Sequence, residues 1–519
     1  MIDNFSWVAV YPEIVLLIMA CVIALVDLWV TSPRRNLTYG LSMLTLASVA
    51  IIQALYASTG TTLYSFGNMV VSDAMGNWLK CFATLAVMVT LIYGRPYVSD
   101  RQMLKGGEWF VLSLFALLGM FVMISGNNFL VIYLGLELLT LSSYALVALR
   151  RDDGNATEAA MKYFVLGALA SGFLLYGLSM LYGATGSLDL NAVFTAVATG
   201  HVKHQVLVLG VVFVVSGLAF KLGAAPFHMW VPDVYQGAPT AVALMIGGAP
   251  KLAVFAMMMR LLVDGLLPLA IDWQQMLMVL AVVTLLIGNL SAIAQTNFKR
   301  MLAFSAIAQM GFVLIGMLSG VVNGNTLSAA NAYSSAMFYM ISYVLTTLGV
   351  FGVILLLARE GFESEEISDL SGLNQRSPLF AGVMAICLFS LAGVPPMVGF
   401  FAKLSVLQAL VATAQPLAIG LAIFAVAMSL IGAFYYLRVI KVMYFDPPLT
   451  ATTVSAGADV RFVLAMNKYR IGCSFGLAGD TQDDIIEAES LQEAEDIAWQ
   501  WALERVSSWA ELVEDDEDE

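Results

Sequence analysis

The chain has 519 residues, of which 60 % are hydrophobic and only 12 % carry a charge. Soluble domains usually contain about 25 % charged residues, and a soluble fold of this size could not bury so much apolar surface. The composition therefore excludes a cytosolic enzyme, a nucleic-acid binder and a disordered scaffold as the main body. It indicates a polytopic membrane protein.

The net charge of −13 belongs to the C-terminal end of the chain. Residues 467–519 contain three basic and sixteen acidic residues, and the remaining sequence contains 21 of each sign. The membrane body is therefore neutral, and it offers no basic patch to which a nucleic acid could bind.

Cysteine and histidine are too few and too scattered to indicate a metal site. The four cysteines form no CxxC pair, and the three histidines are not clustered with them. The sequence also lacks a GxGxxG motif that opens a βαβ unit, a phosphate-binding loop and a haem or flavin signature. We therefore expect no metal, nucleotide or redox cofactor in this chain.

The hydrophobic pattern predicts an all-α polytopic membrane helix bundle. A spanning helix needs about 20 mostly apolar residues, and thirteen segments meet this requirement. The predicted spans are residues 12–31, 38–58, 73–93, 108–125, 128–149, 157–182, 205–225, 240–262, 275–295, 301–321, 331–358, 378–411 and 417–445.

The placement of lysine and arginine predicts the orientation of these spans. Thirteen basic residues follow odd-numbered spans and only two, Lys203 and Arg260, follow even-numbered ones. The thirteen are Arg34, Arg35, Arg95, Arg101, Lys105, Arg150, Arg151, Lys299, Arg300, Arg359, Arg376, Arg438 and Lys441. Because cytoplasmic loops are enriched in basic residues, we expect the N-terminus outside and the C-terminal tail in the cytoplasm.

Ionisable side chains inside a bilayer are costly, so each one is a hypothesis about function. Glu137 is the one carboxylate in the middle of a predicted span. We interpret it as a proton carrier whose charge depends on a neighbouring ammonium, or as a structural partner for a neighbouring helix. The predicted spans also contain five lysines: Lys80, Lys162, Lys221, Lys251 and Lys403.

Proline residues accompany three of these lysines. Lys221 precedes Pro226 by five residues, and Lys251 directly follows Pro250. Proline removes a helix hydrogen bond, and broken helices are tolerated in a membrane where they line a cavity or a wet path. We therefore expect helix 7 to be broken and both lysines to exchange protons, although fixed salt bridges are the plainer interpretation.

Helix 12 shows the same pattern near its centre. Pro395 and Pro396 are expected to break it, and Lys403 lies one to two turns beyond the break. His228 is interpreted either as a proton relay, since histidine titrates near neutral pH, or as a cap of the broken helix 7.

Two further lysines have simpler interpretations. Lys162 lies four residues after Glu158, which favours a local ion pair, although a place on a proton entry path is an alternative. Lys80 lies near a span end, where a long side chain can extend to the membrane surface.

The two proline-broken helices are five spans apart, which gives their surroundings opposite orientations in the membrane. This arrangement is typical of inverted repeats. We predict an N-terminal three-helix segment at 1–107, repeat units at 108–262 (helices 4–8) and 275–446 (helices 9–13), and a cytoplasmic acidic tail at 447–519.

Three long motifs resemble one known family. They are KLGAAPFHMWVPDVYQGAPT (residues 221–240), NFKRMLAFSAIAQMG (297–311) and LAGVPPMVGFFAK (391–403). The sequence is similar, over about residues 1–465, to the antiporter-like membrane subunits of respiratory complex I, NADH:quinone oxidoreductase. The lysine at position 403 and the lack of a long lateral helix favour the N type.

This resemblance implies a role for each buried charge. Glu137 and Lys221 would pair in one state, and quinone chemistry elsewhere would perturb the pair. Lys221 would then pass a proton through Lys251 to Lys403. Family membership also implies the bacterial inner membrane, other complex I membrane subunits as partners, and protons as the only small substrate. NADH, FMN, iron–sulfur clusters and quinone would then be bound by partner subunits.

Two other functions fit the same residues. A subunit of a multisubunit cation/proton antiporter shares these motifs, and sodium-dependent transport without NADH would favour it. A structural membrane subunit whose buried charges only join helices is the second alternative. Proton stoichiometry, the choice between H⁺ and Na⁺ and the type of quinone do not follow from the sequence.

The C-terminal tail departs from the family. N-type subunits usually end with a fourteenth apolar helix, whereas here the family-like sequence stops near Met466 and a polar acidic segment begins. The spacing of apolar residues from Asp484 to Val513 is compatible with a helix. Our hypothesis is that a frameshift, a fusion or a misassembled gene produced residues 466–519.

The mass of the chain extracted from the membrane tests this hypothesis. If the tail is part of the protein, intact mass spectrometry will give about 55.9 kDa. A mass that lacks residues 466–519 would contradict a fusion.

Overall fold

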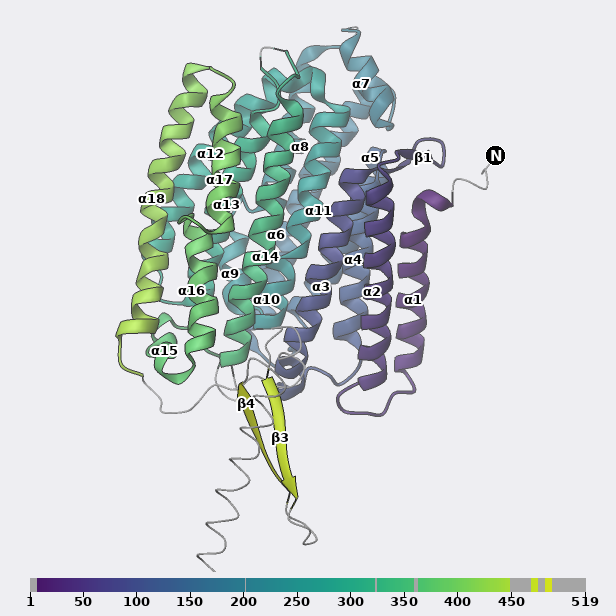
Figure 1. Ribbon diagram of the computed structural model, residues 1–519. Coiled ribbons are helices and arrows are strands. Elements are labelled where there is room, and N and C mark those ends of the chain that lie inside the picture. Colours follow the sequence, from purple (N-terminus) through teal and green to yellow (C-terminus); the bar gives the residue numbers. More distant parts are fainter. Residues whose placement is uncertain are drawn as a thin grey trace, which may run out of the picture. The chain divides into compact units, whose positions relative to one another are not determined.

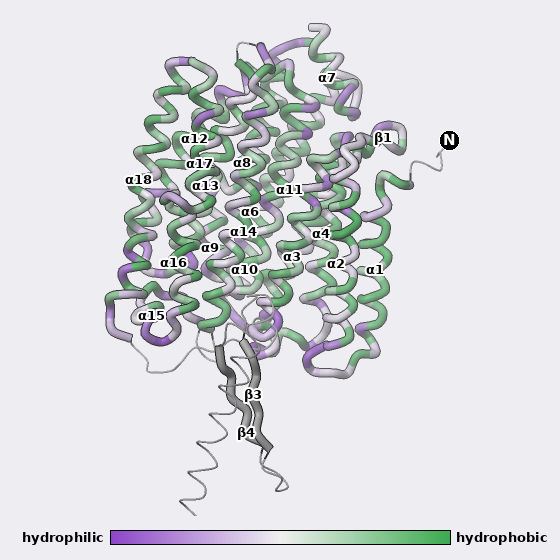
Figure 2. Tube along the Cα trace, viewed as in Figure 1, coloured by the Kyte–Doolittle hydropathy of each residue, from purple (hydrophilic) through white to green (hydrophobic). Residues whose placement is uncertain are grey.

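The computed structural model describes residues 7–200, 202–322, 324–358, 363–448, 468–474 and 481–487. The chain divides into two compact units, residues 1–455 and 456–519. The first unit is a bundle of long helices that run side by side (Figure 1). Hydrophobic residues cover most of the helix lengths, and hydrophilic residues gather near their ends (Figure 2). The predicted all-α membrane bundle is therefore confirmed.

Each of the thirteen predicted spans coincides with helical structure. The helices are α1 (Tyr11–Asp27), α2 (Asn36–Thr59), α3 (Ala74–Asp100), α4 (Glu108–Ser125), α5 (Phe129–Val147), α6 (Gly154–Thr185), α8 (His204–Leu222), α10 (Thr240–Gly247), α11 (Ala249–Met258), α12 (Ala270–Ile293), α13 (Phe298–Leu318), α14 (Ala329–Leu357), α16 (Pro378–Ala392), α17 (Val398–Val411) and α18 (Pro416–Phe445). In the described part of the chain, twelve helical segments are long and apolar enough to cross a membrane. The predicted span 378–411 is divided into α16 and α17, each of which is shorter.

The break in helix 7 lies where Pro226 predicted it. Helix α8 ends at Leu222, Gly223 adopts a left-handed conformation with φ of 80°, and α9 (Trp230–Gly237) begins seven residues later. Glycine ends a helix in this way because it has no Cβ to clash, and proline cannot continue the hydrogen-bonding pattern.

Helix 12 is broken by the same device. Helix α16 ends at Ala392, Gly393 is left-handed with φ of 85°, and α17 begins after Pro395 and Pro396. A third interruption lies in helix 8, where Gly248 (φ −101°, ψ −101°) separates α10 from α11.

Several short elements were not predicted. Strands β1 (Leu63–Ser65) and β2 (Val70–Ser72) pair antiparallel, and the short helix α7 (Leu190–Ala198) lies at the same end of the bundle (Figure 1). Helix α11 continues into a π-helix at Met259–Gly265. Short helical turns occupy Val8–Val10, Leu267–Leu269 and Ile367–Leu370, and α15 spans Leu373–Arg376.

The second unit contains a β-hairpin. Strands β3 (Lys468–Ser474) and β4 (Thr481–Glu487) pair antiparallel, with Lys468 opposite Glu487. The helix predicted from Asp484 is therefore wrong for its first four residues, because Asp484–Glu487 lie in β4. Pairing with the neighbouring strand of the hairpin overrode the local helical spacing. The rest of the predicted helix, residues 488–513, lies outside the described residues.

Helix α13 lies at the centre of the bundle, and almost all its side chains are buried. A helix that is hydrophobic on every face is expected to be surrounded by other helices. Helices α9, α12, α14 and α17 pack around it. It therefore lies next to both broken helices.

Helices α4 and α5 touch through their backbones. A Cβ atom at Gly135 would lie 2.5 Å from the Met123 amide nitrogen, and one at Gly119 would lie 2.5 Å from that of Leu139. Small residues let membrane helices approach this closely. The contact sets the position of α5, and Glu137 lies two residues after Gly135.

Replacing Gly135 with valine should therefore push α5 away from α4. We expect the variant to reduce the amount of assembled protein in membranes several-fold, because backbone rather than a flexible side chain occupies the space. Gly172→Val is the matched control, since a Cβ at Gly172 meets nothing within 4 Å. Equal amounts of both variants in a membrane immunoblot would contradict the close-contact argument.

Candidate functional site

Lys221 lies at the C-terminal end of α8, beside the break. Its side chain is buried, and Nζ donates a hydrogen bond of 3.2 Å to the Ser171 hydroxyl of α6. A positive charge in the last turn of a helix is stabilised by the unpaired carbonyl groups there. Trp230 of α9 spans the break, because its indole N–H donates to the Phe220 carbonyl at 2.8 Å.

Lys251 of α11 binds the broken end of α8 directly. Its Nζ donates to the Leu222 carbonyl at 2.6 Å and lies 3.5 Å from the Lys221 carbonyl. The ammonium also lies 5.5 Å from the centre of the Trp230 ring, within cation–π range. These contacts supply partners for carbonyls that the break leaves without N–H donors.

Lys403 makes the equivalent contacts at the other break. Its Nζ donates to the carbonyls of Leu391 and Ala392, the last two residues of α16, at 3.0 and 2.9 Å. It also donates to the Ser429 hydroxyl at 2.8 Å, and it lies 5.1 Å from the centre of the Phe312 ring. Lys403 therefore resembles Lys251 in position, since each caps the end of a broken helix.

Glu137 is close to this group but is not paired with it. Among the described residues, Lys221 Nζ bonds Ser171 and forms no ion pair with Glu137, and the buried Glu137 Oε1 has no hydrogen-bond partner. The Thr140 hydroxyl lies 3.5 Å from the other carboxylate oxygen, which makes at best a weak hydrogen bond. One oxygen of the Glu137 carboxylate is therefore without a partner among the described residues.

A small cavity connects the lysines of the first break. It has a volume of about 20 Å³ and is lined by, among others, Lys221, Lys251, Thr140, Ser143 and Trp230. This volume is enough for one water molecule, which needs about 10–15 Å³ and two to four polar partners. Residues of both broken-helix ends, Lys221 and Lys251 among them, therefore surround a space of this size.

Polar residues of α13 and its neighbours line the space between the two breaks. Gln309 donates to the Leu391 carbonyl at 3.0 Å and to the Tyr436 hydroxyl at 2.9 Å, and it accepts a hydrogen bond from Tyr339. Ser305 and Tyr436 share a hydrogen bond of 2.5 Å. This group was not predicted from the sequence. Ser305 and Gln309 are four residues apart in an apolar helix, which places them on one face.

His228 lies in the segment between α8 and α9 and points toward α13. The imidazole is buried, its ring centre is 6.5 Å from that of Phe304, and Nδ1 has no hydrogen-bond partner among the described residues. A buried ring nitrogen without a partner is available for a water or a proton.

Lys162 lies away from this group, at a polar cavity. Its Nζ pairs with Glu158 at 2.8 Å, which confirms the predicted local pair, and with Asp233 at 3.0 Å. Its side chain is 44 % exposed. Asp233 also pairs with Arg300 at 2.9 Å, and all four side chains line a cavity of about 570 Å³.

The interpretation of Lys80 was wrong. Its side chain is only 1 % exposed, and Nζ lies 2.5 Å from Glu13 Oε1, which also accepts from the Ser125 hydroxyl at 2.7 Å. Helix α3 packs against α2, α4, α10, α11 and α14, so the side chain has no route to the surface. The spacing along one helix could not reveal a partner 67 residues away.

Arg260, counted above among the basic residues that follow even-numbered spans, is also a buried cation. Its guanidinium pairs with Asp73 at 2.8 Å and with Asp264 at 3.0 Å, and it donates to the Ile124 carbonyl at 3.2 Å. The π-helix that carries Arg260 follows α11 directly. These contacts therefore hold the far end of the helix that carries Lys251.

Comparison with known proteins connects this arrangement to one family. A family profile described as "NADH:quinone oxidoreductase/Mrp antiporter, TM" matches residues 126–429. The chain is 72 % identical to NADH-quinone oxidoreductase subunit N of Polaromonas naphthalenivorans over 90 % of this chain and 94 % of that protein. It is 61 % identical to subunit N of Herminiimonas arsenicoxydans, with the same coverage of each chain.

The chain belongs to the NADH-quinone oxidoreductase subunit N family.

Solved structures agree with membership in the subunit N family. A chain of respiratory complex I from Thermus thermophilus superposes with a TM-score of 0.71 at 30 % identity, over 86 % of this chain and 94 % of that one. A chain of the Mrp complex from Dietzia gives a TM-score of 0.72 at 21 % identity, over 88 % and 86 %, which shows a shared fold. The described residues contain no group of three or more His, Cys, Asp or Glu side chains that could hold a metal ion.

The buried Lys80–Glu13 pair gives a stability prediction for this member of the subunit N family. Lys80→Met would leave the Glu13 carboxylate buried with only Ser125 as a partner. Breaking a buried pair in this way typically costs about 3–5 kcal/mol. We expect a clearly lower thermal midpoint for the purified protein.

Lys105→Met is the control for that measurement, because the Lys105–Asp152 pair is 3.8 Å long and its lysine side chain is 78 % exposed. Exposed pairs contribute about 0–1 kcal/mol. If both variants have the same midpoint, the Lys80 pair contributes no more than an exposed pair.

Proposed function

We propose that this chain is the subunit of NADH:quinone oxidoreductase that translocates protons along the buried chain Glu137, Lys221, Lys251 and Lys403. The observation that carries the proposal is the pair of lysines, Lys251 and Lys403, each bound to the free carbonyls of a broken helix. In this role the chain is a translocase without a redox centre of its own. NADH, FMN, iron–sulfur clusters and quinone would be bound by partner subunits.

The chemistry begins with Glu137. A carboxylate that approaches an ammonium stabilises the protonated lysine, and two unit charges about 4 Å apart interact by about 4 kcal/mol at an effective dielectric of about 20. In the structure Glu137 and Lys221 are not paired, so the Glu137 carboxylate does not stabilise the protonated form of Lys221. Movement of Glu137 toward or away from Lys221 would therefore load or release a proton.

Proton transfer from Lys221 to Lys251 requires a short connection. The cavity between them holds one water molecule by volume, and the Thr140 and Ser143 side chains can orient it. Gln309, Tyr436, Ser305 and Tyr339 would continue the path toward Lys403. His228 and Lys162 are secondary candidates, the former for relay and the latter for proton entry from the polar cavity.

The proposal includes location and organisation. Relatives that are subunits of bacterial complex I imply the inner membrane. We propose that the N-terminus faces outside and that the acidic tail lies in the cytoplasm, as the basic loops predict. We also propose inverted repeats at 108–262 and 275–446, supported by a broken helix with a lysine-capped end in each.

A multisubunit cation/proton antiporter is the second candidate. The shared fold with the Mrp complex supports it, but that likeness is at 21 % identity, whereas subunit N relatives reach 72 %. A purely structural role is the third. It does not account for the unpaired Glu137 oxygen, because a carboxylate that joins helices should be fully hydrogen-bonded.

Glu137→Gln tests the proposal. In inverted membrane vesicles, we expect NADH-driven proton pumping and quinone reduction to fall by about tenfold or more, since a positioned proton-transfer group typically contributes about 10²–10⁴-fold. Assembly is measured in parallel as NADH oxidation by an artificial acceptor such as ferricyanide.

Glu108→Gln is the control for Glu137→Gln, because Glu108 is an exposed carboxylate in the first turn of α4. An assembled Glu137→Gln complex that pumps as well as this control would refute the proton-carrier role. Pumping that requires sodium and no NADH would favour the antiporter instead.

A further inference from the structure

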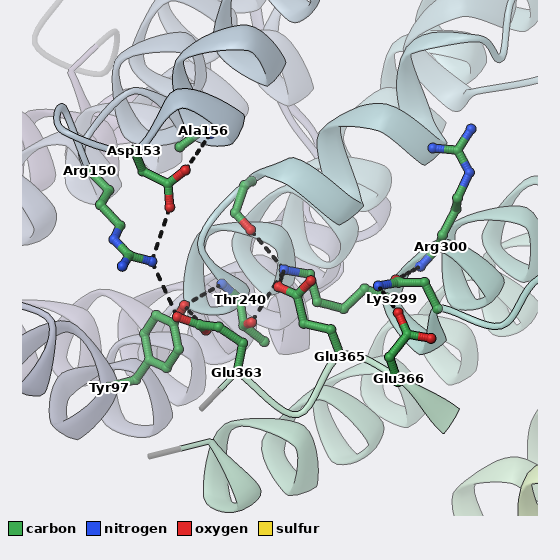
Figure 3. A network of polar contacts seen from close by, with 12 residues as sticks. Tyr97, Arg150, Asp153, Ala156, Thr240, Lys299, Arg300, Glu363, Glu365 and Glu366 are labelled. Carbon is green, nitrogen blue, oxygen red and sulfur yellow. Dashed lines mark hydrogen bonds and ion pairs between the residues drawn. The ribbon is translucent and has the colours of Figure 1, made fainter. Parts of the chain in front are cut away.

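An acidic segment crosses the polar end of the bundle. Residues 363–366, here called the acidic strap, lie between α14 and the helical turn Ile367–Leu370 and contain three glutamates. Their side chains reach basic and hydroxyl groups from several helices (Figure 3). None of these residues belongs to the proposed proton path.

Glu365 is paired with a buried lysine at the start of α13. The Lys299 side chain is 1 % exposed, and its Nζ lies 2.8 Å from Glu365 Oε1. The same ammonium donates to the Ala238 carbonyl at 3.0 Å and lies 3.5 Å from the Thr240 hydroxyl. Lys299 therefore joins the strap to the junction between α9 and α10 (Figure 3).

The junction takes a hydrogen bond from outside its own two helices. Helix α9 ends at Gly237, and the Val242 and Ala243 amides of α10 both donate to the Pro239 carbonyl. The Ala238 carbonyl accepts its hydrogen bond from Lys299. The Thr240 amide, the first of α10, donates to the Tyr97 hydroxyl at 3.1 Å.

Glu363 binds Tyr97, the second residue that contacts the junction. It accepts from the Tyr97 hydroxyl at 2.7 Å, from Arg101 Nε at 2.7 Å and from Arg150 at 3.2 Å. Burial raises the pKa of Glu363, but the hydrogen bonds from Arg101 and Tyr97 outweigh it and hold this pKa below its usual value. Both groups that hold the junction, Lys299 and Tyr97, are thus bound to carboxylates of the strap.

The α9–α10 junction lies between Lys221 and Lys251 along the chain, so the contacts that hold it affect the positions of both lysines. Along the chain, the break after Lys221 is followed by α9, the junction, α10, Gly248 and then Lys251. The junction is therefore the midpoint of the covalent connection between the first two lysines of the path. A shift of the junction would move two short rigid helices and change the distance from Lys251 to the Leu222 carbonyl.

We propose that Lys299 and the acidic strap form a latch that holds the α9–α10 junction and thereby positions Lys251 against the broken end of α8. Lys299 and Tyr97 touch the junction, and Glu365 holds Lys299, so all three are positioning residues outside the proton path. This inference rests on the proposed proton path, and it adds the structural element that sets its first transfer distance.

The competing explanation is that the Lys299–Glu365 pair only stabilises the fold. A double variant separates the two. Glu365→Gln alone leaves a buried ammonium without its counter-ion, so both explanations expect loss of assembly. Removing both charges, in Lys299→Met with Glu365→Gln, relieves that cost. It still leaves the Ala238 carbonyl and the Thr240 hydroxyl without the Lys299 ammonium.

The test measures proton pumping, ferricyanide reduction and backbone hydrogen exchange on the whole complex. For the double variant we expect assembly near the control level, a fall in pumping of about tenfold, and faster exchange of amides 230–247. A displacement of about 1 Å at a reacting site can cost about a hundredfold in rate. Glu366→Gln is the control, since Glu366 belongs to the same strap but contacts Asn297 and the backbone of its own turn.

Two results would overturn the latch. One is a double variant that assembles and pumps like Glu366→Gln, and the other is unchanged exchange at residues 230–247. If the double variant does not assemble, Tyr97→Phe is tested in its place, because it removes a junction contact without removing a charge. Pumping equal to that of Glu366→Gln, or unchanged exchange at residues 230–247, would then overturn the latch. These results are distinct from a failure of the proposed function, which only normal pumping in an assembled Glu137→Gln complex would show.

Discussion

The arrangement of the bundle interior depends on one interaction, the binding of a lysine ammonium to the free carbonyls at the end of a broken helix. A helix that ends inside a membrane leaves up to four carbonyls without donors, and lipid cannot supply them. Lys251 and Lys403 supply donors at the two breaks. The same contact that satisfies the backbone also places a titratable group in the middle of the bundle. One lysine–carbonyl contact thus serves both the fold and the proposed proton transfer.

The buried charged residues discussed above, Lys251 and Lys403 included, fall into two classes. The classes differ in whether a carboxylate is a close partner. Lys80, Arg260 and Lys299 each meet at least one carboxylate within 3.0 Å. Lys221, Lys251 and Lys403 meet hydroxyl and carbonyl oxygens instead, and one oxygen of Glu137 has no hydrogen-bond partner among the described residues. A charge held by a fixed counter-ion is costly to neutralise, whereas one held by neutral dipoles can give up its proton more easily. This difference separates the groups that join helices from those proposed to carry protons.

The buried ion pairs at the two ends of the bundle join different elements. At one end, the Glu13–Lys80 and Asp73–Arg260–Asp264 contacts join the N-terminal three helices to α4 and to the π-helix after α11. At the other, Lys299 and the acidic strap hold the junction of α9 and α10. The connection that carries Lys251 is thus fastened on both sides, and the segment between the α9–α10 junction and Arg260 contains the interruption at Gly248.

The sequence by itself determined the thirteen apolar spans, the helix breaks beside the prolines and the main candidate residues. Thirteen apolar segments, the prolines at 226 and 395–396 and the lysines beside them follow from local composition, because membrane length and backbone chemistry act on each segment alone. Tertiary structure decided the partners. The pairing of Lys80 with Glu13, of Lys299 with Glu365, and the polar group around Gln309 depend on which helices pack together over long sequence separations. Helical periodicity identifies a buried face but does not say which helix covers it.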